Sequence, residues 1–343
     1  MKTLKLLGLT IISTLALWFL LLGSPMGVLP VHAQPQYLMR LAGTQALESD
    51  LTKTCEYFSQ LVQERTKGRV KIEVYPAGQL FSDKDMPRAL PSGAVDIAQV
   101  TSGIWTGLVP ALGIVEVPFF FKDSEHIDRA IDSPGFRKLL DPEFEKQGVK
   151  LLFRLDWGGS HLIASKMALR RLEDFKGKRL RVHGDVPAEL SRALGASPVF
   201  MGTGEVYLGL QRGTVDGVFT TPCLAWDKKY WEVIKFATHL KPGDLMSLPL
   251  MLMNLKKWEE MPPDLQKVLN EAGQEAKSWG IKLAFKRAEE CSAALKGKKV
   301  EIFDITETEK QRWGEACRPI LARYIQHTGE VGKKIVEEIN KVR

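Results

Sequence analysis

The sequence lacks the short motifs that mark the commonest enzyme sites. It contains no G-x-S-x-G, no H-E-x-x-H and no G-x-x-x-x-G-K-[ST], which argues against a nucleophile elbow, a zinc-protease helix and a P-loop. The stretch Gly202-Thr-Gly204 supplies only two of the three glycines of a dinucleotide-binding loop, because Tyr207 stands at the third position. We therefore expect a protein that is not an enzyme and has no cofactor.

The histidines also lack the spacing of metal ligands. None of the six pairs with another histidine or a cysteine at such a spacing. Asp156, His161, His183 and Asp185 could still meet in space, which keeps a metal site as an alternative, although we expect none. A hydrolase using Ser160, His161 and an acid is a second alternative, but adjacent residues rarely form a nucleophile and its base.

Cysteine is scarce, and no pair has the C-x-x-C spacing of a zinc or redox motif. Cys291 and Cys317 each fall in a run with helical periodicity. If those helices pack side by side the two residues could form a disulfide, but the sequence does not supply the geometry that a disulfide requires.

The N-terminus has the pattern of an export signal. Lys2 and Lys5 precede an almost wholly apolar run at 6–22, and Val31-His32-Ala33 places small or compact residues before the expected cleavage after Ala33. An uncleaved membrane anchor is the alternative, since the run is long for a signal peptide. We expect the mature chain, of about 310 residues, to lie in the periplasm.

The charge does not indicate a nucleic-acid partner. The net charge is +7, but lysine and arginine are spread along the chain, with 296–299 the nearest thing to a cluster. A dispersed basic surface serves solubility and could favour acidic ligands.

The segment 175–222 predicts both a fold and a ligand site. A basic strand candidate at 178–182 and short apolar strand candidates at 197–201 and 215–219 alternate with helical runs, a βαβαβ pattern that favours a parallel sheet covered by helices. Small molecules bind at the carboxyl ends of such strands, where Arg181 and Thr221 fall.

The rest of the chain continues as mixed α/β. Strands are predicted at 37–44, 69–75, 95–100 and 150–155, and helices at 49–66, 83–92, 124–130, 134–147, 223–236, 262–295 and from about 306 onward. The extended stretch 239–255 is expected to cross between two lobes.

A dense set of short motifs fills the segment 174–222. They are D-F-K-G at 174–177, L-R-V at 180–182, A-L-G-A at 193–196, P-V at 198–199, E-V-Y at 205–207, L-Q at 210–211, V-D-G at 215–217 and Pro222. Further motifs are V-Y-P-A-G-Q-L at 74–80, G-A-V-D at 93–96 and W-E-E-M-P-P-D-L-Q-K at 258–267. With these motifs the mature chain resembles the solute-binding proteins of TRAP (tripartite ATP-independent periplasmic) transporters, the DctP-like family.

The resemblance implies a two-lobed, periplasmic-binding-protein-like (type II) α/β fold, in which each lobe is a mixed sheet flanked by helices. We expect lobe I to comprise 34–157 plus about 247–285, and lobe II to comprise 158–246 plus about 286–343. It also implies a monomer that captures a small organic acid between the lobes and delivers it to membrane permease subunits. A sensor that reports the ligand to a receptor is the alternative.

The family pattern assigns the carboxylate anchor to Arg181, because most members pair an arginine of this strand with the substrate. A second family arginine is replaced by His161, and an acid-Asn pair by Thr220-Thr221.

Four more residues belong to the expected ligand site. Thr101 stands where sialic-acid-binding members carry a charge, while Thr44, Trp105 and Trp157 are expected to shape the cleft. These changes predict a monocarboxylate with an apolar or aromatic body, although the sequence does not name it.

Overall fold

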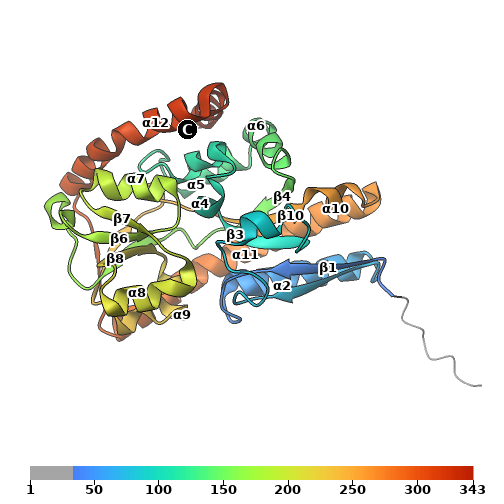
Figure 1. Ribbon diagram of the computed structural model, residues 1–343, viewed down its shortest axis with the longest axis horizontal. Coiled ribbons are helices and arrows are strands. Elements are labelled where there is room, and N and C mark those ends of the chain that lie inside the picture. Colours follow the sequence, from blue (N-terminus) through green and yellow to red (C-terminus); the bar gives the residue numbers. More distant parts are fainter. Residues whose placement is uncertain (1–33, 343) are drawn as a thin grey trace, which may run out of the picture. The chain divides into compact units, whose positions relative to one another are not determined.

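Two mixed β-sheets form the framework of residues 34–342, the part of the chain that the computed structural model describes (Figure 1). The predicted signal segment 1–33, with its cleavage after Ala33, lies outside the described residues. From Gln36 onward the chain forms one compact unit. The predicted α/β class with two sheets flanked by helices is confirmed.

The first sheet has the strand order β2-β1-β3-β10-β4. Its strands are β1 (Tyr37–Ala42), β2 (Val70–Tyr75), β3 (Ile97–Thr101), β4 (Val149–Arg154) and β10 (Pro249–Asn254). β1 runs parallel to β2 and β3, whereas β10 is antiparallel to β3 and β4. The late strand β10 therefore returns to the first sheet, as the extended stretch 239–255 predicted.

The second sheet has the order β11-β9-β5-β8-β6-β7. Its strands are β5 (His161–Ser165), β6 (Arg179–Val182), β7 (Ser197–Phe200), β8 (Gly217–Thr220), β9 (Phe236–Leu240) and β11 (Glu301–Asp304). β6 is parallel to both β7 and β8, so the predicted βαβαβ unit is confirmed. β5 is antiparallel to β8 and β9, which makes the sheet mixed.

Several helices begin at conventional capping residues. Ser49 accepts a hydrogen bond from Thr52 N at the start of α2, and Thr306 accepts one from Glu309 N at the start of α12. The helices are α2 (Asp50–Arg65), α3 (Met86–Ala89), α4 (Ser102–Trp105), α5 (Ser124–Ile131), α6 (Pro134–Glu145), α7 (Asp185–Ala193), α8 (Val206–Arg212), α9 (Pro222–Asp227), α10 (Leu255–Glu259), α11 (Pro263–Gly297) and α12 (Glu307–Lys341). Short 3₁₀ turns occur at Pro110–Glu116, Leu172–Phe175, Thr203–Glu205 and Tyr230–Glu232.

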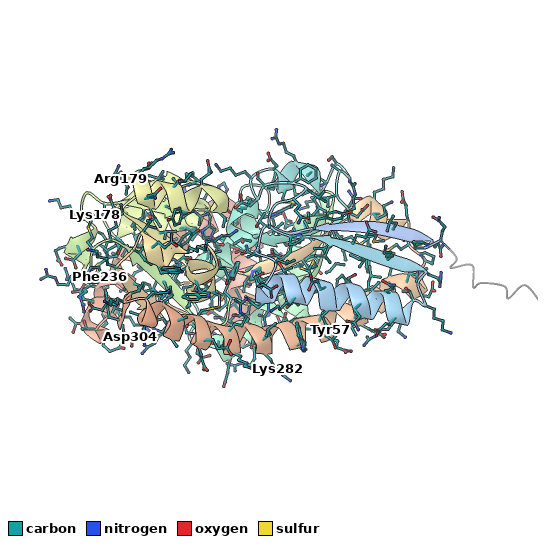
Figure 2. All side chains as sticks on the ribbon, turned by 90° about the horizontal axis from the view of Figure 1, so that it is seen from below. Tyr57, Lys178, Arg179, Phe236, Lys282 and Asp304 are labelled. Carbon is teal, nitrogen blue, oxygen red and sulfur yellow. A yellow bond between two sulfur atoms is a disulfide. The ribbon has the colours of Figure 1, made fainter. Side chains whose placement is uncertain are left out.

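Two long helices connect the sheets. The amino-terminal half of α11 contributes Leu265 and Leu269 to the core beneath the first sheet, and Leu295 near its end enters the core beneath the second. Figure 2 shows α11 running from the level of Tyr57 past Lys282 toward Asp304. α12 packs on α5, α6 and α7, as its course along these helices in Figure 1 shows.

Two sequence expectations about the region after Pro222 are wrong. The helix predicted at 223–236 ends at Asp227, because Lys229 takes a left-handed φ of 55° and Phe236 already begins β9. The bridge considered between Cys291 and Cys317 is replaced by a disulfide between Cys291 and Cys223, which ties α11 to α9. Cys317 is a buried free thiol in the core beneath α12.

No helix within residues 34–342 is both long and apolar enough to cross a membrane.

Candidate ligand-binding site

A cavity lies between the ends of the two sheets. It is lined by Gln45, Thr101, Ile104, Trp157, His161, Arg181, His183, Pro187, Thr203, Phe219, Thr220, Thr221, Leu224, Leu245, Met246 and Ser247. These residues come from loops after β1 and β4, from the end of β3, from strand ends of the second sheet and the turns that follow them, from the helices α4, α7 and α9, and from the crossover 241–248. Five of the seven predicted site residues, Arg181, Thr221, His161, Trp157 and Thr101, are among them.

The strand directions explain why distant residues meet here. β6 and β8 are parallel, so Arg181 and Thr221 lie at or just beyond the same edge of the sheet. β5 runs the other way, with Leu162 paired to Thr220, so His161 at its start reaches that edge as well. The site is therefore a consequence of sheet topology.

Arg181 is the most buried cation of the site, with 3% of its surface exposed. Its Nε donates to Met201 O at 2.9 Å, and its Nη2 lies 3.5 Å from Thr203 Oγ1. Among the ion pairs within 4.0 Å in the described chain, none involves Arg181. Burial lowers the pKa of Arg181, so an anion placed against the guanidinium would stabilise its charge.

His161 is a neutral hydrogen-bonding group. Burial, followed by the nearby His183 and His239, lowers the pKa of His161 to about 3. Its Nε2 accepts from Ser247 N at 3.3 Å. Since a backbone N–H can only donate, the proton of the neutral ring lies on Nδ1, which can donate to a ligand.

Thr221 is both a cap and a cavity residue. Its Oγ1 accepts from Leu224 N at 3.2 Å and so begins α9, while its hydroxyl hydrogen can still be donated. The Cys223–Cys291 disulfide follows at once and fixes this helix to α11.

Trp157 is held by a tight turn. Asp156 Oδ1 accepts from the N–H groups of Gly158 and Gly159 at 2.7 and 2.8 Å. Gly158 has a φ of 81°, and a Cβ there would lie 2.4 Å from Ala284 O, so the turn packs directly on α11. Trp157 Nε1 is buried and has no hydrogen-bond partner within the described residues, which makes it a donor available at the cavity wall.

Two predicted site residues do not line the cavity. Trp105 is fully buried in the core shared by the two sheets, and the preceding Ile104 faces the cavity instead. Thr44 is half-buried, its carbonyl lies 3.4 Å from Lys228 Nζ, and the next residue, Gln45, lines the cavity. In both cases the prediction is displaced by one residue: Thr44 lies in a loop, which has no side-chain period, and Trp105 was expected in a loop but ends the four-residue helix α4.

The polar clusters near the site do not form the metal centre considered from the sequence. No group of three or more His, Cys, Asp or Glu side chains that could hold a metal occurs within residues 34–342. Instead of meeting His161 and Asp185, Asp156 caps its own turn.

Ser160 contacts a different histidine from the one expected. Its Oγ lies 3.2 Å from His239 Nε2, and His239 Nδ1 lies 2.7 Å from Asp304 Oδ1. The nearest amides in the sequence, those of Gly158 and Gly159, already bond to Asp156, so they cannot stabilise an oxyanion.

Solved structures and curated proteins resemble this chain over most of its length. A crystal structure of a TRAP periplasmic solute-binding protein from Sulfurospirillum deleyianum with bound succinate matches with a TM-score of 0.81 and 26% identity, over 90% of this chain and 100% of that chain. The C4-dicarboxylate-binding periplasmic protein of Rhodobacter capsulatus is 28% identical over 304 residues, 88% of this chain and 90% of that protein. The 2,3-diketo-L-gulonate-binding periplasmic protein of Escherichia coli is 28% identical over 263 residues, 76% of this chain and 78% of that protein.

A family model matches directly. It describes the bacterial extracellular solute-binding proteins of family 7, DctP, and it covers residues 41–327. The proteins of this family are binding receptors of transporters and not enzymes, which agrees with the absence of catalytic motifs. The chain belongs to this family, the DctP-like solute-binding proteins of TRAP transporters.

Proposed function

We propose that this solute-binding protein captures a small monocarboxylate with an apolar or aromatic body and delivers it to the permease of a TRAP transporter. The ligand carboxylate pairs with Arg181, and its body lies against the apolar wall of the cavity. The observation that carries this proposal is the burial of the Arg181 guanidinium at a cavity wall, with its only hydrogen-bonding partners neutral.

The charge of the cavity favours one carboxylate over two. Of the described residues that line it, Arg181 is the only lysine, arginine, aspartate or glutamate. His161 is neutral at physiological pH, since its pKa is about 3. The nearest carboxylate to His183 Nε2 is that of the buried Glu116, whose Oε1 lies 3.8 Å away and which does not line the cavity. A second ligand carboxylate would be desolvated without a cation to match it.

The size and lining of the cavity favour a compact, apolar body. About 40 Å³ is open to the centre of a water-sized sphere, whereas one water molecule needs about 10–15 Å³ by that measure. The wall includes Ile104, Trp157, Phe219, Leu224 and Leu245. Such a wall stabilises apolar or flat groups better than the hydroxyls of a sugar acid.

The ligands of the relatives support the general class. The relatives' names and structures mention C4-dicarboxylates, 2,3-diketo-L-gulonate and succinate, all of them organic acids. We therefore expect this chain to retain an acid ligand while differing in what surrounds the carboxylate.

A thermal-shift screen tests the ligand class. The panel comprises monocarboxylates (lactate, pyruvate, benzoate, phenylacetate), dicarboxylates (succinate, malate) and sugar acids (gulonate, glucuronate). We expect the largest rise in melting temperature with a monocarboxylate, since at equal concentration the ligand that binds more tightly stabilises the folded state more. A clear preference for succinate, malate or a sugar acid contradicts the proposal.

The cellular setting and lobe division are part of the same proposal. We expect an exported monomer in the periplasm, with the segment 1–33 cleaved after Ala33, as the family description "extracellular" supports. We expect the lobes to comprise 34–157 plus about 247–285, and 158–246 plus about 286–343. The membership of β10 in the first sheet and β11 in the second supports this division.

A further inference from the structure

Two polar contacts join the halves of the protein beside the ligand cavity. The segment before α3 lies between β2 and β3 of the first sheet, and the turn Thr203–Glu205 lies between β7 and β8 of the second. Asp83 contacts Thr203, and Lys84 pairs with Glu205. We call these two contacts the clasp.

Asp83 makes the more specific contact of the clasp. Its Oδ2 accepts from the backbone N–H of Thr203 at 3.0 Å and from Thr203 Oγ1 at 2.7 Å. One carboxylate oxygen thus fixes both the backbone and the side chain of the same residue. Charge-assisted hydrogen bonds of this kind are stronger than neutral ones.

Thr203 in turn contacts the proposed anchor. Because its hydroxyl hydrogen is donated to Asp83, its Oγ1 faces Arg181 Nη2, 3.5 Å away, as an acceptor. The neighbouring Met201 O accepts from Arg181 Nε at 2.9 Å. Among the described residues, the turn held by Asp83 and the residue two positions before it therefore supply the hydrogen-bonding partners of the guanidinium, and the charge of Asp83 favours the charged form of Arg181.

The clasp lies where the cavity meets a larger hollow. This hollow, about 270 Å³ in volume, is lined by Asp83, Lys84, Phe200 and Gly202, and it shares Ile104, Arg181 and His183 with the ligand cavity. Thr203 lines the inner cavity, whereas Asp83 lines the outer hollow. A ligand that leaves between the two sheets on this side has to pass the clasp.

We propose that Asp83 is a positioning residue for ligand binding: through Thr203 it orients Arg181 and retains the ligand by holding the two halves together. This inference rests on the proposed function, because it takes Arg181 as the carboxylate anchor. Lys84 and Glu205 are both exposed, so their pair contributes little on its own.

The mechanism predicts which rate constant changes. Asp83→Ala removes contacts that form only when the halves meet, so the ligand escapes faster while encounter is unaffected. We expect dissociation to be about fivefold to tenfold faster and association to stay within twofold, since a net hydrogen bond corresponds to such factors. Thr203→Val should accelerate dissociation to a similar extent, whereas Thr203→Ser, which keeps the hydroxyl group, should dissociate at the wild-type rate.

The experiment combines stopped-flow kinetics with hydrogen exchange. Tryptophan fluorescence reports association and dissociation of the ligand, because Trp157 lies at the cavity wall. The ligand is the tightest monocarboxylate of the panel above, and the proteins are the wild type, Asp83→Ala, Thr203→Val and the double variant. If Asp83 acts through Thr203, the double variant is no worse than the worse single variant. Asp85→Ala is the matched control, because Asp85 bonds to Ser82 and Arg88 of its own segment.

Hydrogen exchange of the ligand-saturated protein, in which the halves meet, provides a structural readout of the clasp. The Thr203 amide should exchange faster in Asp83→Ala than in the wild type, and at the wild-type rate in Asp85→Ala. Unchanged exchange, unchanged dissociation or additive effects in the double variant overturn the clasp while leaving the anchor role intact. If Arg181→Ala binds the ligand as tightly as the wild type, the proposed function is overturned instead, whatever the clasp variants show.

Discussion

Arg181 and His161 lie at the same edge of the second sheet, but burial leaves them with different charges. It lowers the pKa of both side chains. An arginine still stays protonated, because its ordinary pKa is far above neutrality, whereas His161, with a pKa of about 3, is neutral. The position to which the family resemblance assigns a second arginine is thus occupied by an uncharged donor, which is why we expect a single ligand carboxylate.

The neutral state of His161 has a consequence for stability at acid pH. Its folded-state pKa, about 3, lies below the ordinary 6.5. Above pH 6.5 both states are neutral, so the residue has no effect there. As the pH falls from 6.5 toward 3 the unfolded chain takes up the proton first, and the free energy of unfolding drops.

Urea denaturation at pH 7 and pH 5 measures this effect. Between these pH values the free energy of unfolding of His161→Gln should fall by about 2 kcal/mol less than that of the wild type. This figure follows because one pH unit between the two pKa values corresponds to about 1.4 kcal/mol. An identical pH dependence in the two proteins would show that His161 is not held neutral by the fold.

The sequence predicted several of the residues that line the cavity. Arg181 and Thr221 were predicted because strand ends of a βαβαβ unit have a defined edge, His161 was predicted from the family resemblance, and all three line the cavity. Gln45 and His183 were not assigned to it, since nothing in a loop sequence shows which side chain faces inward. The same limit displaced Thr44 by one residue, whereas Trp105 was taken for a loop residue and lies in the short helix α4.

At the scale of secondary-structure elements, strong periodicity and the alternation of short strands with helices were predictive, but one isolated short strand was missed. The helix predicted at 262–295 is α11, Pro263–Gly297, and the strand predicted at 69–75 is β2. The short strand β5 was not predicted, because five apolar or small residues after a glycine turn have no distinctive period. The mixed character of both sheets also depends on strands that return from far along the chain.

The disulfide connects two such distant elements. Cys223 begins α9 beside the cavity, and Cys291 lies 68 residues later on α11. Removal of both cysteines, as Cys223→Ser with Cys291→Ser, should lower the free energy of unfolding by about 2–4 kcal/mol, because the unfolded chain gains conformational freedom.

Thiol titration distinguishes this pairing from the one considered from the sequence. The denatured, unreduced protein should show two free thiols, Cys55 and Cys317, and peptide mapping should find Cys223 linked to Cys291. A peptide that links Cys317 to Cys291 would contradict the structure.

At the scale of the whole molecule, the two sheets supply different parts of one site. The second sheet contributes Arg181 and Thr221 at its edge, while the first contributes Thr101 at the end of β3, and the Trp157 loop connects the two. α11 and α12 pack against both halves, and the clasp joins them at the cavity. A binding protein of this family can therefore change its ligand by exchanging a few edge residues while the sheets remain.

The central claim is that Arg181 binds the carboxylate of the ligand, and titration calorimetry with the tightest monocarboxylate of the screen tests it most directly. Arg179→Ala is the matched control, because Arg179 lies on the same strand but is exposed and pairs with Asp216. We predict that Arg181→Ala weakens binding about 100-fold or more, since loss of one partner of a buried ion pair costs about 3–5 kcal/mol, and that Arg179→Ala stays within about threefold of the wild type. Equal affinities of Arg181→Ala and the wild type would contradict the account.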